Sequence, residues 1–482
     1  MICVVIKGPT FEEAHHQISK ALEYADLVEL RLDLFEILDL EALKSLQTHF
    51  SIPMIFTLRS QSKRLEDIRS LAALKPQYLD LEEETPPYFI AEIASQYPAV
   101  KLILSYHHFE ATPEDLEGIY FEMKKTPAYF YKVAVTAQNS LDAMRLIFWA
   151  KESDDKLIAI SMGSHGQISR ILSPMIGCPI TYAALEEGGE VAPGQLSAKI
   201  LIDRYHHRSL NLETTLYGLI GDPVSQSISH ETHNRFMSAQ GLNAVYIKMQ
   251  VKAEELTDFL DYAKRLPFCG LSVTMPLKER ILSLLDEIDS QAAAIGAVNT
   301  LLLKKGKTFG YNTDGIGALN AIESEFLVRG KRMVIIGAGG ASKAIAYEAI
   351  HRGALVTIIN RDSTKAFQMA KRLQCVGKGL EDMADCAKAG YDILINCTPV
   401  SMPIDPQYIL PHVLVMDITT KPKETMLLQH AMRKNCQIVY GYKMFVEQAK
   451  GQFDLWFKDK FVLSNTLVNR VKLIDCMQNV LS

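Results

Sequence analysis

The sequence predicts an α/β protein whose 482-residue chain has two halves with different rhythms of strands and helices. Three observations lead to this prediction. Eight short apolar runs alternate with helical patterns over residues 1–209, a second α/β alternation begins at 215, and a glycine-rich turn lies at 337–340. We therefore expect a (β/α)8 barrel followed by α/β domains with open sheets.

The barrel prediction rests on the spacing of the apolar runs. Most of them are separated by segments with the spacing of amphipathic helices, such as 11–23 and 140–149. An open doubly wound sheet is the alternative, but the first half has no glycine turn of the kind that binds phosphates. The runs occupy residues 3–6, 27–32, 53–58, 78–81, 102–106, 129–135, 157–161 and 180–183.

The second half follows a short boundary at 210–215, after which a new strand is predicted at 216–220. A strand at 334–336 runs into the glycine turn, and a helical pattern continues at 344–350. We expect the barrel at 1–209, one α/β domain at 215–315, a nucleotide-binding domain at 316–440, and helices at 441–482 that return to the second domain.

Composition narrows the function classes. Charged residues at 22%, hydrophobic residues at 48% and a net charge of -5 are ordinary for a globular protein and argue against nucleic acid or an anionic membrane as partner. The cysteines form no C-x-x-C pair, so we expect no metal site, no disulfide framework and a cytoplasmic location. No apolar run has the length of a membrane span or signal peptide. The oligomeric state cannot be predicted from this sequence.

One lysine interrupts an apolar strand pattern in the barrel half. Lys132 lies inside the run 129–135, and because barrel strands are covered on both faces, its side chain is expected to enter the lumen. Burial disfavours the ammonium form of a lysine and frees the amine for Schiff-base chemistry. The alternative is a lumen lysine merely paired with Glu29 or Glu82.

Other polar residues follow the strand ends where barrel enzymes place their active sites. His107 suits a general base, since imidazole titrates near neutral pH, and Glu82 could orient it. A buried structural histidine is an equal alternative. A group of arginines at one barrel mouth implies an anionic substrate, although each could instead form a structural ion pair: Arg31, Arg59 and Arg170.

The motifs of the first half resemble, in order, those of type I 3-dehydroquinate dehydratases. The matching strings are Glu29-Leu30-Arg31, Thr57-Leu58-Arg59, Asp80-Leu81-Glu82, Ser105-Tyr106-His107, Tyr131-Lys132, Ser161-Met162-Gly163, Ser169-Arg170 and Ala192-Pro193-Gly194-Gln195. The resemblance implies that Lys132 is the Schiff-base lysine and that His107 transfers the proton, with Glu82 positioning it. It also implies substrate contacts from Glu29, Arg31, Arg59, Arg170 and Gln195. Val191 stands where the family often has Ser, which questions one substrate hydrogen bond.

The glycine turn of the second half predicts a dinucleotide site. A run of β-branched residues leads through the turn into a helical pattern, which is the strand–turn–helix context of a Rossmann-type fold. Backbone N–H groups and the helix dipole would face a pyrophosphate there. A tight turn without a ligand is the alternative. The predicted cofactor-binding residues of the turn are Gly337, Ala338, Gly339, Gly340 and Ala341.

Several polar motifs surround this turn. Hydroxyls and an amide suit a polyol carboxylate, and a lysine with an aspartate suits proton transfer to a carbonyl oxygen that receives hydride. Singly, such motifs are mostly structural, since the segment 312–315 is typical of a turn and Lys278 begins an ordinary helix.

As an ordered set, these motifs resemble shikimate dehydrogenases over the second half. The strings are Gly221-Asp222-Pro223-Val224-Ser225-Gln226-Ser227-Ile228-Ser229, Thr274-Met275-Pro276-Leu277-Lys278, Gly296-Ala297-Val298-Asn299-Thr300, Tyr311-Asn312-Thr313-Asp314-Gly315, Asn396-Cys397-Thr398 and Gly441-Tyr442-Lys443-Met444-Phe445-Val446-Glu447-Gln448-Ala449. The resemblance implies that Lys278 and Asp314 are the catalytic pair. It implies substrate contacts from Ser227, Ser229, Thr274, Asn299 and Gln448.

The residues after the next strand favour NADP over NAD. NAD enzymes place an acidic group there, whereas this chain has Asn360, Arg361 and Lys365, which fit a 2′-phosphate. Some positions depart from the family pattern and leave a relaxed cofactor or substrate preference open: Asp362 for Thr, His230 for Pro, Ser401 for Gly and Thr420 for Tyr.

Together, the sequence predicts a bifunctional enzyme of the shikimate pathway. The barrel would convert 3-dehydroquinate to 3-dehydroshikimate, and a two-domain α/β dehydrogenase with a Rossmann-type NADP-binding domain would reduce that product to shikimate with NADPH. The alternative is an NADP dehydrogenase of shikimate or quinate with a non-catalytic barrel. The presence of Lys132, His107 and Glu82 together argues against an inactive barrel.

Overall fold

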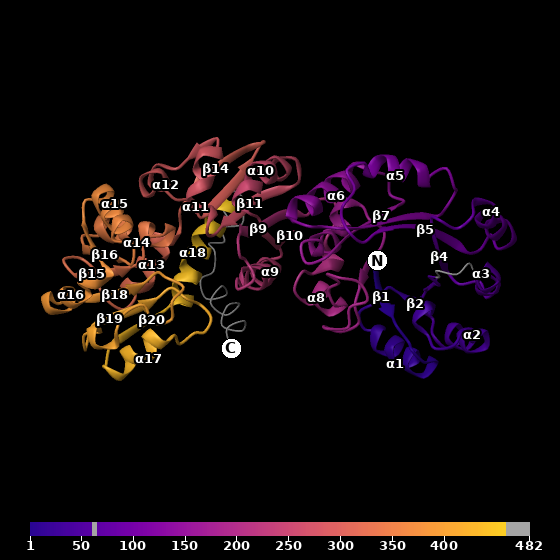
Figure 1. Ribbon diagram of the computed structural model, residues 1–482, viewed down its shortest axis with the longest axis horizontal. Helices are drawn as coiled ribbons and strands as arrows, with labels where there is room; N and C mark the ends of the chain where they lie inside the picture. The colour runs from indigo at the N-terminus through magenta and orange to yellow at the C-terminus, as the bar shows by residue number, and fades with distance from the viewer. Residues whose placement is uncertain (60–64, 459–482) are drawn as a thin grey trace. The chain divides into compact units, whose positions relative to one another are not determined.

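The computed structural model describes residues 1–59 and 65–458, and its contacts divide the chain into two compact units (Figure 1). The first unit holds Met1–Leu216, Met237–Val251 and Thr257–Pro267. The second holds Tyr217–Phe236, Lys252–Leu256 and the chain from Phe268 onward. Of the predicted C-terminal helical segment, residues 459–482 lie outside the described residues.

Parallel strands form the barrel of the first unit, which confirms the predicted fold. Neighbouring strands follow the order β7-β6-β5-β4-β3-β2-β1-β8, and in the described residues no ladder joins β7 to β8, so the ring is nearly closed. Each predicted apolar run became one strand: β1 (Ile2–Ile6), β2 (Leu27–Arg31), β3 (Met54–Thr57), β4 (Tyr78–Glu82), β5 (Lys101–His108), β6 (Phe130–Thr136), β7 (Leu157–Met162) and β8 (Thr181–Ala183).

Helices lie outside these strands (Figure 1). Several begin at a residue whose side chain accepts a backbone N–H of the first turn, among them Thr10 before α1, Asp39 before α2 and Asn139 before α6. Inside the ring, alternate strand residues such as Val5, Ile103 and Ile160 pack into one apolar cluster. The helices are α1 (Phe11–Ala21), α2 (Leu40–His49), α3 (Leu65–Ala73), α4 (Pro87–Gln96), α5 (Leu116–Met123), α6 (Ser140–Glu152), α7 (Gln167–Ile171) and α8 (Ala198–Asp203).

A second sheet follows in the order β10-β9-β11-β13-β14-β12. It is mixed, since β13 pairs antiparallel with both β11 and β14, whereas β12 runs parallel to β14. Its strands are β9 (Thr215–Gly221), β10 (Ala244–Gln250), β11 (Phe268–Val273), β12 (Glu287–Ile288), β13 (Thr300–Lys304) and β14 (Lys307–Tyr311). The helices of this segment are α9 (Ser229–Ala239), α10 (Leu256–Arg265), α11 (Leu277–Arg280) and α12 (Ser290–Ile295).

The third sheet is parallel throughout, with the order β17-β16-β15-β18-β19-β20 of a Rossmann-type fold. The order reverses between β15 and β18, and such switch points form the ligand crevice of open α/β sheets. Its strands are β15 (Arg332–Ile336), β16 (Leu355–Asn360), β17 (Val376–Gly379), β18 (Ile393–Asn396), β19 (Leu414–Asp417) and β20 (Gln437–Tyr440). Its helices are α13 (Asp314–Glu323), α14 (Gly340–His351), α15 (Ser363–Leu373), α16 (Met383–Ala389), α17 (Met426–Arg433) and α18 (Gly441–Trp456).

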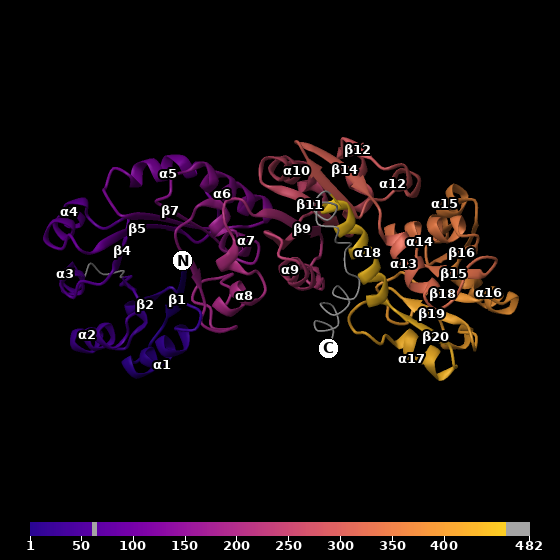
Figure 2. The ribbon, with the colours of Figure 1, turned by 180° about the vertical axis from the view of Figure 1, so that it is seen from behind.

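Helix α18 connects the third sheet to the second (Figure 2). It starts directly after β20, runs along α13, and ends where the Trp456 indole N–H donates to the carbonyl oxygen of Leu301 on β13, at 2.8 Å. Among the described residues, no helix is long and apolar enough to cross a membrane.

Candidate active sites

The barrel contains a cavity of about 280 Å³ at the carboxyl ends of its strands. Its lining brings together most residues that the sequence predicted for this half. Glu82 is the one predicted barrel residue that does not line the cavity. The predicted residues in the lining are Glu29, Arg31, Arg59, His107, Lys132, Arg170 and Gln195.

Lys132 extends from β6 into this cavity and is only 2% exposed. Its ammonium forms an ion pair with the Asp80 carboxylate on β4 and lies 4.9 Å from the centroid of the Tyr182 ring. The second oxygen of Asp80 accepts a hydrogen bond of 2.7 Å from the Ser105 hydroxyl. The lysine is therefore paired, as one sequence alternative held, but its partner is neither Glu29 nor Glu82.

Asp80 was missed as a site residue in the sequence. Strand alternation does place Asp80 and Glu82 on the same face of β4, which is the signal that could have identified it. Burial acts to raise the pKa of the Asp80 carboxyl, but the positive charges of Lys132 and Arg59 and the neighbouring His107 bring that pKa below its ordinary value. Asp80 is therefore a carboxylate at neutral pH.

His107 lies at the end of β5, with its Nε2 2.5 Å from the Arg59 Nη2 and its ring stacked on Phe109. Because a guanidinium can only donate, Nε2 is the acceptor and the imidazole proton lies on Nδ1. Burial lowers the pKa of His107 to about 2, and the positive charges of Lys132 and Arg59 act in the same direction. The imidazole is thus a neutral base at physiological pH.

The predicted contact from Glu82 to His107 is not formed. Within the described part of the chain, no hydrogen bond joins the two side chains, and the contact recorded for the imidazole comes from Arg59. Glu82 is half-buried, and burial raises the pKa of its carboxyl. The positioning of His107 by Glu82 therefore stays a prediction, and the described part of the structure shows no hydrogen bond between the two side chains.

The three arginines of the cavity differ in what neutralises them. Arg170 is 2% exposed, and it donates to the Ser161 carbonyl at 2.6 Å. Its Nε is buried without a partner, and burial lowers the pKa of the guanidinium to about 10. The Nε of Arg59 is also buried and unpaired. Arg31 instead forms a bidentate pair with Asp33, at 2.9 and 2.6 Å. Buried unpaired donors are costly, so Arg59 and Arg170 point to an anionic ligand.

Two further polar side chains of the cavity are held by their neighbours. Glu29 accepts from the Thr57 hydroxyl at 2.8 Å, and Gln195 accepts from the backbone N–H of Val191 at 2.8 Å. Val191 itself lines the cavity and offers no hydroxyl there, as its departure from the family pattern predicted.

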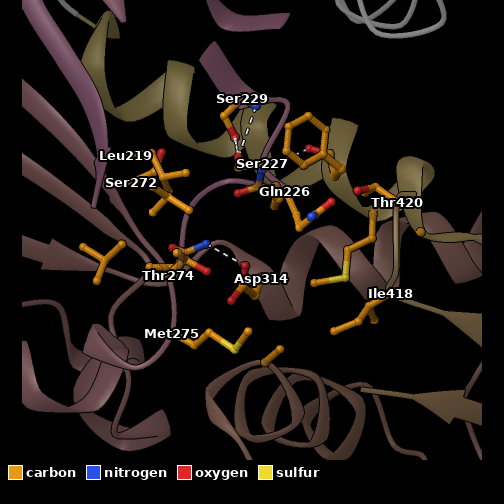
Figure 3. Close-up of a pocket in the computed structure, with 18 of the residues that line it drawn as sticks. Leu219, Gln226, Ser227, Ser229, Ser272, Thr274, Met275, Asp314, Ile418 and Thr420 are labelled. Carbon is orange, nitrogen blue, oxygen red and sulfur yellow. Dashed lines mark hydrogen bonds between the residues drawn. The ribbon is translucent and has the colours of Figure 1, made fainter. Parts of the chain in front are cut away.

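A second cavity of about 380 Å³ lies in the second unit, between the second and third sheets (Figure 3). Figure 3 shows Ser227 and Ser229 on one wall, Ile418 and Thr420 on another, and Asp314 between them. All the catalytic and substrate-contacting residues predicted for the second half line this cavity: Ser227, Ser229, Thr274, Lys278, Asn299, Asp314 and Gln448.

Lys278 and Asp314 form an ion pair at the centre of this cavity. Lys278 lies in α11 and Asp314 begins α13, and their Nζ and Oδ2 atoms are 2.5 Å apart. Asn299 donates to the other oxygen of Asp314 at 2.7 Å, while its own amide oxygen accepts from the Thr313 N–H and the Thr300 hydroxyl. The structure thus uses Asn299 to orient Asp314, a task that the sequence did not assign to it.

Further polar groups come from Ser227 before α9, from Ser229 at its start and from α18. The Ser227 hydroxyl donates to the Ser229 hydroxyl at 3.0 Å. Gln448 reaches the cavity because α18 approaches α13 closely: a Cβ on Gly317 would lie 2.7 Å from the Gln448 backbone nitrogen. Gln452, one helical turn further along α18, was missed in the sequence although it shares that face. It accepts from the Ser272 hydroxyl at 3.1 Å.

The glycine turn lies next to the same cavity. Gly337 has a φ of +115°, and Ala341 in the first turn of α14 lines the cavity. A Cβ on Gly340 would lie 3.2 Å from the Lys278 side chain, whereas one on Gly339 would meet nothing within 4 Å. The turn therefore lies beside Lys278 at the start of α14, and the backbone N–H groups of a helix N-terminus suit a dinucleotide pyrophosphate.

The predicted 2′-phosphate residues follow β16. Asn360 ends that strand, and Arg361 is exposed beside it. Asp362, the departure from the family pattern, is the N-cap of α15, and its carboxylate is 3.8 Å from the Lys365 ammonium. Part of the Asp362 charge is thus used within the helix cap, so the segment fits a phosphate. Among the described residues, no cluster of His, Cys, Asp and Glu could hold a metal ion.

Comparison with known proteins gives a consistent result for both halves. The profile of type I 3-dehydroquinases matches residues 2–211, that of the shikimate dehydrogenase substrate binding domain matches 219–301, and that of shikimate/quinate 5-dehydrogenases matches 321–428. The shikimate biosynthesis protein AroDE of Chlamydia pneumoniae is 40% identical over 95% of this chain and 96% of its own length.

Two other relatives extend the comparison. The bifunctional 3-dehydroquinate dehydratase/shikimate dehydrogenase, chloroplastic, of Arabidopsis thaliana is 34% identical over 95% of this chain and 82% of its own length. The crystal structure of a shikimate dehydrogenase in complex with NADP+ aligns with a TM-score of 0.51 at 35% identity, and covers 57% of this chain and 98% of that chain.

Proposed function

The chain belongs to the family of bifunctional 3-dehydroquinate dehydratases/shikimate dehydrogenases, and from this premise we propose which residues carry the two reactions. It is a type I 3-dehydroquinate dehydratase joined to an NADP-dependent shikimate dehydrogenase, and both activities belong to the shikimate pathway. The observation that carries the residue assignment is that a cavity in each half is lined by a lysine ion-paired with an aspartate, buried in the barrel and partly buried in the dehydrogenase half.

In the barrel, Lys132 forms a Schiff base with the ketone of 3-dehydroquinate. This assignment is supported by its burial and by its place among the arginines that suit an anion. The iminium withdraws electrons from the adjacent C–H bond, so that bond is weakened in the intermediate.

His107 is the general base and then the general acid. The neutral imidazole takes the proton from the carbon next to the iminium, and the electron pair moves toward nitrogen. The same proton then goes to the departing hydroxyl, which leaves as water when the C–O bond breaks and the new C=C bond forms. The pKa of about 2 supports the first step, since burial holds His107 in its basic form.

Arg170 holds the substrate carboxylate in this proposal. Its buried unpaired Nε, and that of Arg59, are the donors that an anion would satisfy. Glu29, Gln195 and the neutralised Arg31 line the same cavity and contact hydroxyls. Glu82 keeps no assigned contact, since it lies outside the lining.

In the second half, Lys278 donates a proton to the carbonyl oxygen of 3-dehydroshikimate. NADPH, when bound, supplies the hydride. Asp314 holds the lysine ammonium, Asn299 fixes Asp314, and Ser227, Ser229, Thr274 and Gln448 bind the substrate carboxylate and hydroxyls. The backbone of the glycine turn binds the pyrophosphate, while Asn360, Arg361 and Lys365 bind the 2′-phosphate.

The decisive experiment supplies the purified full chain with 3-dehydroquinate and either NADPH or NADH, and follows both products by chromatography. We expect 3-dehydroshikimate without cofactor and shikimate when NADPH is added, with slower reduction by NADH. Sodium borohydride during turnover should attach the substrate carbon skeleton to Lys132, identified by peptide mass. Turnover without a mass change at Lys132 would refute the Schiff-base assignment.

Quinate is a second candidate substrate of the dehydrogenase. The matching family profile is named for shikimate and quinate, and Thr420, which stands where the family usually has Tyr, lines the cavity. Oxidation of quinate and of shikimate by the same preparation, compared as kcat/KM, separates the two. For location, we propose the cytoplasm, which is supported by the absence of disulfides among the cysteines of the described ranges.

A further inference from the structure

We propose that Asp80 is a catalytic residue of the barrel, which takes a proton from the Lys132 ammonium as the Schiff base forms and then stays as the counter-ion of the iminium. This inference rests on the proposed role of Lys132. It assigns a chemical task to a carboxylate to which the sequence analysis gave no role, although Asp80 belongs to one of the matching strings.

The contacts of Asp80 fix both of its oxygens. One accepts from Lys132 Nζ, and the other accepts from the Ser105 hydroxyl at 2.7 Å, which itself lies 3.3 Å from the Leu81 carbonyl. In the described part of the chain, no other carboxylate contacts this ammonium: Glu29 accepts from Thr57 instead. The Asp80 side chain is 1% exposed and that of Lys132 is 3% exposed, so water has little access to the pair.

Lys132 must lose a proton before its nitrogen can attack a ketone, and the lumen offers few acceptors. His107 Nε2 accepts from Arg59, and in the described residues no hydrogen bond joins the imidazole to the Lys132 ammonium. Asp80 is in direct contact with the ammonium. Moving the proton to Asp80 converts two buried charges into two neutral groups, and a dry interior favours that change.

Titratable and charged groups from several strands surround the Lys132–Asp80 pair. Lys132 and the Asp80 carboxylate face the ring of Tyr182 on β8, the imidazole of His107 on β5, and the thiol of Cys3 on β1. Two cations, Arg59 and Arg31, act on the same region from the ends of β3 and β2, together with the carboxylate of Glu29. Asp80 is therefore the carboxylate in contact with Lys132 in a region that also contains two guanidinium groups.

The proton balance of the step is complete with these groups. The ammonium gives one proton to Asp80, and the neutral amine forms a C–N bond to the ketone carbon while the C=O π electrons move to oxygen. That oxygen takes the proton from Asp80 and a second proton from the nitrogen, and leaves as water. The third proton remains on the iminium, and Asp80 is again a carboxylate beside a cation.

The test is the rate of borohydride trapping at Lys132 in the Asp80→Asn variant of the full chain. We expect trapping and kcat to fall by on the order of 10²- to 10³-fold, the range for loss of a proton-transfer group, with KM changed only a few-fold. The residual rate should rise with pH, because the proton must then leave to solvent. The wild-type rate should depend less on pH over the same range.

A matched control is available on the barrel surface. Asp203 pairs with Lys199 at 2.7 Å on α8, with both side chains exposed, so Asp203→Asn removes the same kind of ion pair without touching the lumen. This variant should trap at the wild-type rate. Equal trapping rates for wild type and Asp80→Asn would overturn the proposal, whereas absence of any adduct at Lys132 in the wild type would refute the Schiff-base role instead.

A purely structural role for Asp80 predicts a different pattern. A loss of structure would raise KM in proportion to the loss of kcat, and the pH dependence of the trapping rate would be the same as in the wild type. That pattern would also overturn the proposal. If Asp80→Asn does not fold, Ser105→Ala decides the matter, since it keeps both charges but frees the carboxylate to rotate. We expect about a 10-fold slower trapping rate there, and an unchanged rate would contradict the inference.

Discussion

The two cavities contain the same pair of side chains in different surroundings. In the barrel, the Lys132 side chain is 3% exposed and that of Asp80 is 1% exposed. In the dehydrogenase half, the corresponding values for Lys278 and Asp314 are 17% and 7%. This difference agrees with the proposed roles, since a lysine that forms a covalent bond would be kept from water, whereas one that only donates a proton would need a route to solvent for its reprotonation.

The groups around each pair differ as well. The barrel lysine lies among arginines, two of which have buried donors without a partner, so this cavity suits a carboxylate bound by charge. The dehydrogenase cavity is lined by hydroxyls and amides such as Ser227, Thr274 and Gln448. Under the proposed assignments, one substrate skeleton would be bound by ion pairs in the buried barrel cavity and by neutral hydrogen bonds in the more exposed dehydrogenase cavity.

Replacing Lys132 should have the largest effect on activity. A small effect would contradict the different roles proposed for the two lysines. We expect Lys132→Ala to lower dehydration by on the order of 10⁴-fold or more, as deletion of a covalent nucleophile does, and to spare reduction of added 3-dehydroshikimate. Separate assays of the two steps measure this. Lys199→Ala, on the exposed face of α8, serves as control, and a parallel loss of both activities would contradict independent sites.

Lys278→Ala should give the converse result with a smaller loss. Removal of a general acid typically costs about 10²- to 10⁴-fold, because hydride transfer then leaves an unprotonated alkoxide. Reduction is measured by NADPH absorbance, and dehydration by the absorbance of the conjugated product. A reduction rate of the variant that recovers at low pH would support the role of Lys278 as proton donor. A loss of dehydration in the same variant would argue against that role.

The sequence located most of this chemistry because strand ends and alternation are local properties. Each predicted barrel strand formed, and the residues at their ends met in one lumen as the alternating pattern of β2, β5 and β6 required. Lys278 and Asp314 line the second cavity and the glycine turn lies beside Lys278, because each of them follows the end of a strand.

Partner choice inside the cavities could not be predicted. Glu82 pairs in register with Ser105, and Ser105 with Lys132, so Glu82 lies level with the lysine along the sheet. The lysine side chain nevertheless reaches Asp80, two residues earlier, because barrel stagger and side-chain direction are three-dimensional properties. Asn299, directly before β13, likewise donates to Asp314 at the start of α13. No local motif encodes this contact between two separate segments.

Replacing Arg170 should have an intermediate effect that tests binding by charge. We expect Arg170→Gln to weaken binding of the dehydratase substrate, so that its KM rises about 10- to 100-fold, the range for a lost hydrogen bond to a charged group, with kcat less affected. Steady-state dehydration rates over a range of substrate concentrations measure both constants. Arg31→Gln should raise KM less, since Asp33 already neutralises that guanidinium. Equal increases of KM in the two variants would contradict the different roles expected for Arg170 and Arg31.

The pH dependence should show the smallest effect. Since the folded-state pKa of His107 is depressed to about 2, the imidazole stays neutral above that pH and gains a proton only far into acid. The kcat/KM of dehydration should therefore show no acid limb near the ordinary histidine value of about 6.5. Initial rates at low substrate across pH measure this, and a half-maximal rate near that value would mean that the site protonates His107 normally.

Gly317 touches no reacting group, yet it sets the width of the second cavity. A methyl group at that position would lie 2.7 Å from the backbone of Gln448 and would push α18 away from α13. Gln448 and Gln452 would move outward on the same helix, away from Asp314 and from the strand that Trp456 contacts. The absence of a side chain at Gly317 therefore allows the close approach of α13 and α18 that brings Gln448 into the same cavity as Asp314.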